Sequence, residues 1–156
     1  MEEIGAFLEY LRYERNYSEE TGKSYKVDLL QFEGFANECE LQLKDVNSNT
    51  IREWVVQMMD KGMSASSINR KLSALRSFYK YLLKQGKVTA DPMRKISGPK
   101  KKKPLPVFVK EKEMDRLLDD IDFGDSFEGH RDKLIIQLFY ETGMRLAELE
   151  IGRAHV

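Results

Sequence analysis

Cysteine, proline and long apolar runs are all scarce in this sequence of 156 residues. Its one cysteine, Cys39, cannot form a disulfide within the chain, which is typical of a reducing compartment. We predict that Cys39 is buried filler near a helix end and not a nucleophile. There is no run of about 18 apolar residues and no signal peptide, so we expect a cytoplasmic protein without a membrane partner. The alternating pattern of strands is also missing, which favours an all-α fold.

Net charge is missing as well, because 26 basic and 26 acidic residues cancel. A neutral total argues against a nucleic-acid binder, but the charges are segregated along the chain. Residues 61–104 hold 13 Lys and Arg against one acidic residue, whereas residues 1–60 hold 6 against 13 and residues 105–156 hold 7 against 12. Segregated charge creates local fields that steer polyanions. The middle of the chain is therefore the candidate surface for an acidic partner.

Apolar residues recur at helical spacing through the first 90 or so residues and predict four amphipathic helices. The first runs from about Glu2 to Arg15, and Ser18, Asn47 and Ser64 are the predicted N-caps of the next three. For the third helix we predict a buried side of Ile51, Val55, Met58 and Met59, with Trp54 also packed in the core. Four such helices with short connections form a small bundle.

The helix from Ser64 to Gly86 is the most basic part of the chain and has two distinct faces. Its apolar stripe is Ile68, Leu72, Leu75, Tyr79 and Leu82. The opposite face has hydroxyls, an amide and four or five cations, depending on Lys71, but no carboxylate: Ser66, Asn69, Arg70, Ser73, Arg76, Ser77, Lys80 and Lys84. A solvated face usually mixes charges of both signs. The purely cationic pattern favours contact with a phosphate backbone, and a merely solvated face is the alternative.

Beyond this helix, residues 97–107 contain three prolines and the run Lys100–Lys103, which predicts an extended basic tether without packing contacts. The run is either a solubilising linker or a phosphate contact. Helical periodicity resumes from Phe108, with Leu134, Ile135, Leu138 and Phe139 on the apolar side of a helix that ends at Gly143. Partners for Leu134, Leu138 and Leu149 are not evident in the chain, so we expect an exposed apolar patch there.

Four stretches, in the correct order over residues 1–149, resemble the tyrosine site-specific recombinases, the family of phage integrases and Xer proteins. Thr142-Gly-Met-Arg-Leu-Ala-Glu-Leu149 is similar to the family's T-G-[LM]-R-x-x-E-L box. The stretch from Tyr17 to Phe32 resembles the start of its core-binding domain, and Ser67 to Tyr79 resembles its DNA-facing helix. The pairs Asp91-Pro92, Pro99-Lys100 and Leu105-Pro106 match its interdomain segment.

The resemblance implies a four-helix SAM-like core-binding domain at residues 1–96, a basic proline-rich linker at 97–107, and a truncated start of the catalytic domain at 108–150. It implies a clamp around duplex DNA carrying a recombination site, with other recombinase protomers as partners. Strands in this family are cleaved by a tyrosine that forms a 3′-phosphotyrosyl bond, with no metal and no cofactor.

By position, the resemblance makes Arg145 the first catalytic arginine and Glu148 the acidic residue that orients it. The forked donors of Arg145 would hold the scissile phosphate, whereas the structural alternative is an ion pair that stabilises a helix start. The predicted DNA contacts lie on two helices and the tether: Thr21, Lys23, Ser24, Ser66, Asn69, Arg70, Ser73, Arg76, Lys80, Lys100, Lys101, Lys102 and Lys103.

The chain also departs from the family pattern. None of its seven tyrosines matches the nucleophile, and neither His130 nor His155 matches a catalytic histidine. The stretch Glu150–Val156 resembles the translation of a sequencing adaptor, so we expect residues 151–156 to be a foreign tail on a catalytically incomplete fragment. The alternatives are a stand-alone helical DNA-binding module without recombinase activity and a helical adaptor that binds acidic proteins.

Overall fold

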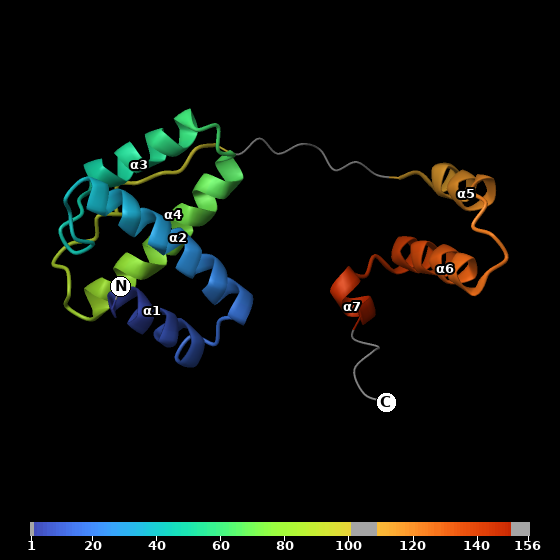
Figure 1. The fold of residues 1–156 in the computed structure, drawn as a ribbon, viewed down its shortest axis with the longest axis horizontal. Helices are drawn as coiled ribbons and strands as arrows, with labels where there is room; N and C mark the ends of the chain where they lie inside the picture. The colour runs from blue at the N-terminus through green and yellow to red at the C-terminus, as the bar shows by residue number, and fades with distance from the viewer. Residues whose placement is uncertain (1, 101–108, 151–156) are drawn as a thin grey trace. The chain divides into compact units, whose positions relative to one another are not determined.

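The computed structural model describes residues 2–100 and 109–150. The chain divides into two compact units, Met1–Lys103 and Pro104–Val156, which we call the first and second units and describe separately (Figure 1). All regular secondary structure within the described ranges is helical, which confirms the all-α prediction. Among these helices, none is both long and apolar enough to span a bilayer.

The first unit contains α1 (Glu2–Tyr13), α2 (Glu19–Glu38), α3 (Ser48–Asp60) and α4 (Ala65–Lys84). The three predicted N-caps are confirmed. Ser18 Oγ accepts from the Thr21 N–H, Asn47 Oδ1 from two N–H groups, and Ser64 Oγ from the Ser67 N–H. Each cap satisfies backbone donors that have no partner within their own helix. Sequence-local chemistry therefore accounts for where these helices begin.

The core of the first unit forms around α4, which packs against α1, α2 and α3. Phe78 and Tyr79 of α4 are fully buried together with Phe7 of α1 and Phe32 of α2. Trp54 of α3 lies edge-on to Phe32, with ring centroids 4.9 Å apart, and its predicted place in the core is confirmed. Because α4 is buried along one side, its other side is presented as a continuous outer face.

Two burial predictions for the first unit are wrong. Met59 is exposed because the buried side of α3 runs through Thr50, Ile51, Trp54 and Met58, which turns the next residue outward. Cys39 is exposed too, at the C-cap of α2. The chain reverses at Glu40, whose φ of 58° is left-handed, so Cys39 is left on the outside of the turn.

The segment that follows α4 returns along the bundle and adds Met93 and Ile96 to the core. The Ser48 hydroxyl donates to the carbonyl of Pro92 at 2.7 Å, which ties this segment to the start of α3. The expectation that nothing beyond residue 96 packs is wrong for Gly98 and Pro99. Both are half-buried against α4, because Asn69 bonds the backbone there.

The second unit contains α5 (Glu111–Asp120), α6 (Phe127–Thr142) and α7 (Leu146–Glu150). Gly143, the predicted end of α6, has a left-handed φ of 64°. The start of α6 is capped by Ser126, which was not predicted. Among residues 109–150 only Gly129 is buried. Leu134 is 62% exposed, which confirms the expected apolar patch at that position, whereas Leu138 and Leu149 are half-buried. Residues 151–156, the predicted foreign tail, lie outside the described residues.

Candidate nucleic-acid interface

The outer face of α4 is concave. Six side chains line an open depression there, five of which the sequence analysis predicted to bind DNA: Ser66, Ser67, Asn69, Arg70, Ser73 and Arg76. Lys80 is exposed one turn beyond Arg76 on the same helix. The depression arises because small hydroxyl side chains alternate with long cationic ones on one side of a helix. Its lining holds donors and cations but no carboxylate.

Arg70 is anchored and not freely solvated. Its Nη1 donates to Asp28 Oδ2 at 2.6 Å and its Nη2 to Asp28 Oδ1 at 2.9 Å, while its side chain stays 48% exposed. Asp28 lies on α2 and is only 1% exposed. A two-point fork of this kind fixes the plane of the guanidinium as well as its position. The prediction of Arg70 as a plain surface cation is therefore incomplete.

Lys71, which was counted only conditionally among the cations of the outer face, is buried between α4 and α2. Its Nζ donates to Asp28 Oδ1 at 2.9 Å and also to the side-chain carbonyl of Gln31. Lys84, at the other end of the helix, lies near Glu14 (3.7 Å) and over the ring of Tyr10. The cations that remain on the outer face are Arg70, Arg76 and Lys80.

Asn69 and Arg76 hold the backbone that leads into the lysine run. Asn69 Nδ2 donates to the carbonyl of Pro99 at 2.8 Å, and Arg76 Nη2 donates to that of Ile96 at 3.3 Å. Gly98 lies so close that a Cβ there would come within 2.1 Å of Asn69 Oδ1. The run thus begins at a fixed point beside α4. Lys100 is exposed, and Lys101, Lys102 and Lys103 lie outside the described residues.

The predicted contacts on α2 lie near its N-terminus. Ser24 is exposed, Thr21 is half-buried with its hydroxyl 2.9 Å from that of Ser18, and Lys23 lies between two carboxylates. Lys23 Nζ is 2.9 Å from Glu20 and 3.1 Å from Glu19. The hydrogen bonds with Glu20 and Glu19 raise the pKa of Lys23. The hydrogen bond with Lys23 lowers the pKa of Glu19. Two carboxylates therefore balance the charge of Lys23 in the free protein. Exposed pairs of this kind are weak, so a phosphate can compete for the ammonium group.

In the second unit, Arg145 and Glu148 are in direct contact. The Arg145 N–H donates to Glu148 Oε2 at 2.7 Å, and Arg145 Nη1 donates to Oε1 at 3.1 Å. The Arg145 side chain is otherwise 84% exposed. This geometry suits both an oriented catalytic arginine and a simple helix-start ion pair. Within the residues that the structure covers, no group of His, Cys, Asp or Glu side chains could hold a metal ion.

The role of Asp28 was not predicted, although the spacing of residues in the sequence contains a signal for it. Asp28 lies three residues after Tyr25 and four before Phe32, which places it on the apolar side of α2. Lys71 lies three residues after Ile68 and four before Leu75, on the apolar side of α4. Opposite charges on the buried sides of two helices predict a buried ion pair.

Residues 4–86, which run from the first turn of α1 to two residues beyond α4, match the family model of the phage integrase N-terminal SAM-like domain. The chain belongs to the phage integrase family of tyrosine recombinases. This match confirms the resemblance and the SAM-like fold of the first unit.

Curated relatives carry the similarity beyond that domain. The chain is 38% identical over 144 residues to the tyrosine recombinase XerC of Staphylococcus aureus strain JH9, and equally identical over 143 residues to that of Staphylococcus epidermidis. Each alignment covers 92% of this chain and 48% of the relative. The chain therefore spans about half the length of the curated relatives it matches.

Proposed function

We propose that the outer face of α4 and the lysine run bind duplex DNA, as the DNA-binding part of a cytoplasmic tyrosine recombinase that acts with other recombinase protomers on a recombination site. The observation that carries the proposal is the depression on α4, which combines Arg70 and Arg76 with hydroxyl and amide groups and has no carboxylate. Residues 1–96 would form the DNA-binding domain, residues 97–107 the linker, and residues 108–150 part of the catalytic domain.

Proteins make most of their contacts with DNA through its phosphates and sugars. Cations on the protein displace condensed counterions from the phosphates, which supplies affinity that depends steeply on salt. Serine hydroxyls donate to phosphate oxygens and fix the register on the duplex. The outer face of α4 offers both kinds of group, and Asn69 and Arg76 place the first residues of the lysine run beside it.

Reversing Arg76 and Lys80 to Glu in the full chain tests this proposal. We expect loss of the gel shift of a duplex with unchanged helical circular dichroism, because two attractions to phosphate become repulsions. Arg70 is left intact, since a glutamate there would face Asp28 and disturb the fold.

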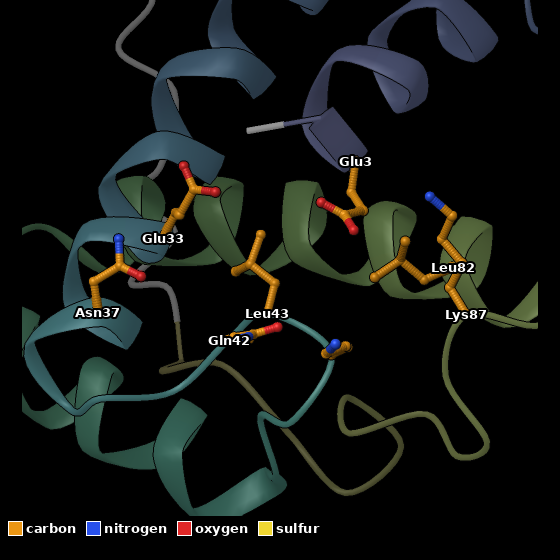
Figure 2. A pocket seen from close by; sticks show the side chains of 8 residues that line it. Glu3, Glu33, Asn37, Gln42, Leu43, Leu82 and Lys87 are labelled. Carbon is orange, nitrogen blue, oxygen red and sulfur yellow. The ribbon is translucent and has the colours of Figure 1, made fainter.

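The matched control reverses Lys44 and Lys87, which line a different depression together with Glu3 and Glu33 (Figure 2). The control carries the same change in net charge, so it should retain most of the binding. Equal loss in both variants would show that total charge, and not the face of α4, determines binding. Affinity that barely responds to salt would instead favour a protein-interaction adaptor.

The contribution of the lysine run is tested by replacing Lys100–Lys103 with Ser. If the run lies on the phosphate backbone, the slope of log affinity against log salt should flatten by about three to four units. An unchanged slope would place these lysines away from the DNA, as expected of a solubilising linker.

The recombination chemistry is part of the same proposal. Arg145, oriented by Glu148, would hold non-bridging oxygens of the scissile phosphate. We expect that a polypeptide of these 156 residues forms no covalent adduct with a nicked suicide substrate on a denaturing gel. Groups that act as a unit lose most of their effect when one is missing, and no tyrosine of the chain matches the family's nucleophile. A covalent protein–DNA band would contradict this and assign the nucleophile to one of the seven tyrosines.

A further inference from the structure

Three charged side chains meet where α2 crosses α4. Both oxygens of the buried Asp28 carboxylate are used: Oδ2 accepts from Arg70, and Oδ1 accepts from Arg70 and from Lys71. Lys71 is buried with Asp28, whereas Arg70 reaches the depression on the outer face. We call these three residues the Asp28 triad. It joins an element of the core to the candidate DNA surface.

The charge of the triad matters for a polyanionic partner. A lone Asp28–Arg70 pair would be neutral and would present little field to a phosphate. With Lys71 present, one negative and two positive charges leave a net positive charge, and Arg70 is the member most exposed to solvent. The buried lysine thus offsets the carboxylate, so Arg70 remains attractive although it is ion-paired.

The geometry of the fork matters as well. A guanidinium has five N–H donors, and Asp28 engages two of them through the terminal nitrogens. The remaining donors are free to meet a phosphate oxygen or a base edge. A long side chain that is already held in place loses less conformational entropy on binding than a freely rotating one.

We infer that Asp28 is a positioning residue for DNA binding, which holds the Arg70 guanidinium at the α4 depression, and that Lys71 is buried to cancel the Asp28 charge. This inference rests on the proposed function, since it requires the face of α4 to contact DNA. Neither Asp28 nor Lys71 touches DNA under this inference; both act through Arg70.

The decisive experiment is a cycle of variants in the full chain, measured against a fluorescently labelled duplex of about 30 base pairs of mixed sequence. Asp28→Asn with Lys71→Met removes one charge of each sign, so net charge is unchanged and no unpaired buried ion remains. We expect this pair of changes to weaken binding roughly two- to tenfold, because Arg70 must now be ordered on binding. In an Arg70→Ala background the same pair of changes should weaken binding no further.

Equal weakening in both backgrounds would overturn the inference, because it would show a structural role that does not act through Arg70. No weakening in either background would also overturn it. Arg70→Lys is the second variant: it keeps the charge and the buried pair but cannot form the two-point fork. It should weaken binding by a similar factor, and wild-type affinity for this variant would contradict the inference.

The role of Lys71 is tested by comparing the DNA affinity of Lys71→Met alone with that of the Asp28→Asn and Lys71→Met double variant. Lys71→Met alone leaves the Asp28 charge to neutralise Arg70, so this variant should bind more weakly than the pair of changes with Asp28→Asn. The opposite order would overturn the assignment of Lys71. Thermal melting confirms that each variant is folded at the temperature of measurement. A wild-type chain that does not bind the duplex would overturn the proposed function itself, an outcome distinct from these.

Discussion

Both units of the chain are helical, but of the residues with a described structure only those of the first unit form an apolar core. In the first unit, the other three helices converge on α4 and bury aromatic residues such as Phe7, Phe32 and Phe78. In the second unit, large apolar side chains remain exposed along all three helices and the segments around them: Val109, Leu117, Ile121, Phe127, Leu134, Tyr140 and Leu146. The difference lies in packing and not in secondary structure.

This comparison separates two causes of helix formation. The cap of α6, in which Ser126 Oγ accepts from the Gly129 N–H, is built like the caps of α2 and α4. Local signals of this kind set where a helix begins, but most helical stability comes from burying an apolar face. Among the residues that the structure describes, α5, α6 and α7 have local signals for helix formation but bury little apolar surface. We therefore expect the second unit to open far more easily than the first.

The largest expected effect comes from truncating one apolar side chain in each unit. Phe78→Ala removes a ring packed edge-on against Phe7 at 5.4 Å and should lower the free energy of unfolding by about 3–5 kcal/mol. Leu134→Ala should change the stability of the first unit by less than about 0.5 kcal/mol, as for an exposed site. Urea unfolding followed by Trp54 fluorescence reports on the first unit alone. A loss of less than about 1 kcal/mol for Phe78→Ala would contradict the burial described here.

A smaller effect is expected from alkaline pH. Burial raises the pKa of Tyr79 above its usual range, and its hydroxyl donates to the Leu43 carbonyl at 2.9 Å. The unfolded chain releases this proton near pH 10 while the folded chain keeps it, so stability is intact below pH 10 and falls as pH rises above it. The loss should reach about 1.4 kcal/mol by pH 11.

Variants at one tyrosine in each unit isolate this effect. The Tyr79→Phe variant should be less stable than the wild type at neutral pH by about 0.5–1.5 kcal/mol, because the hydrogen bond is lost. Between neutral pH and pH 11, however, its free energy of unfolding should fall less than that of the wild type. Tyr140→Phe, in the second unit, should follow the wild-type profile of Trp54 fluorescence. The same alkaline loss in Tyr79→Phe and wild type would assign the effect to other groups.

The smallest effect concerns the helix caps. Ser64→Ala should lower the free energy of unfolding of the first unit by about 1 kcal/mol, since α4 loses the partner of the Ser67 N–H. Ser126→Ala should leave the Trp54 transition unchanged and reduce only the total helical signal in circular dichroism. A shift of the Trp54 transition by Ser126→Ala would show that the stabilities of the two units are coupled.

Much of the first unit could be predicted from the sequence, because the signals are local. Serine and asparagine caps precede each of α2, α3 and α4, and a left-handed glycine, Gly86, follows α4 with a φ of 66°. The apolar stripe of α4 was also correct, with Ile68, Leu72, Leu75, Tyr79 and Leu82 all buried. These features depend on residues within one or two turns of each other, so spacing alone is sufficient to infer them.

Only the tertiary structure decided which cations of α4 are anchored. Asp28 and Arg70 are 42 residues apart, and their contact depends on how α2 and α4 are rotated against each other. Spacing within one helix carries no information about that rotation, so Arg70 looked like a free cation. The hydrogen bond from Asn69 to the Pro99 carbonyl, which anchors the start of the lysine run, could not be predicted either. Every residue has a backbone carbonyl, so the pattern of side chains does not indicate which carbonyl is bound. Periodicity determined which residues face outward on α4, and packing between distant segments determined what holds them there.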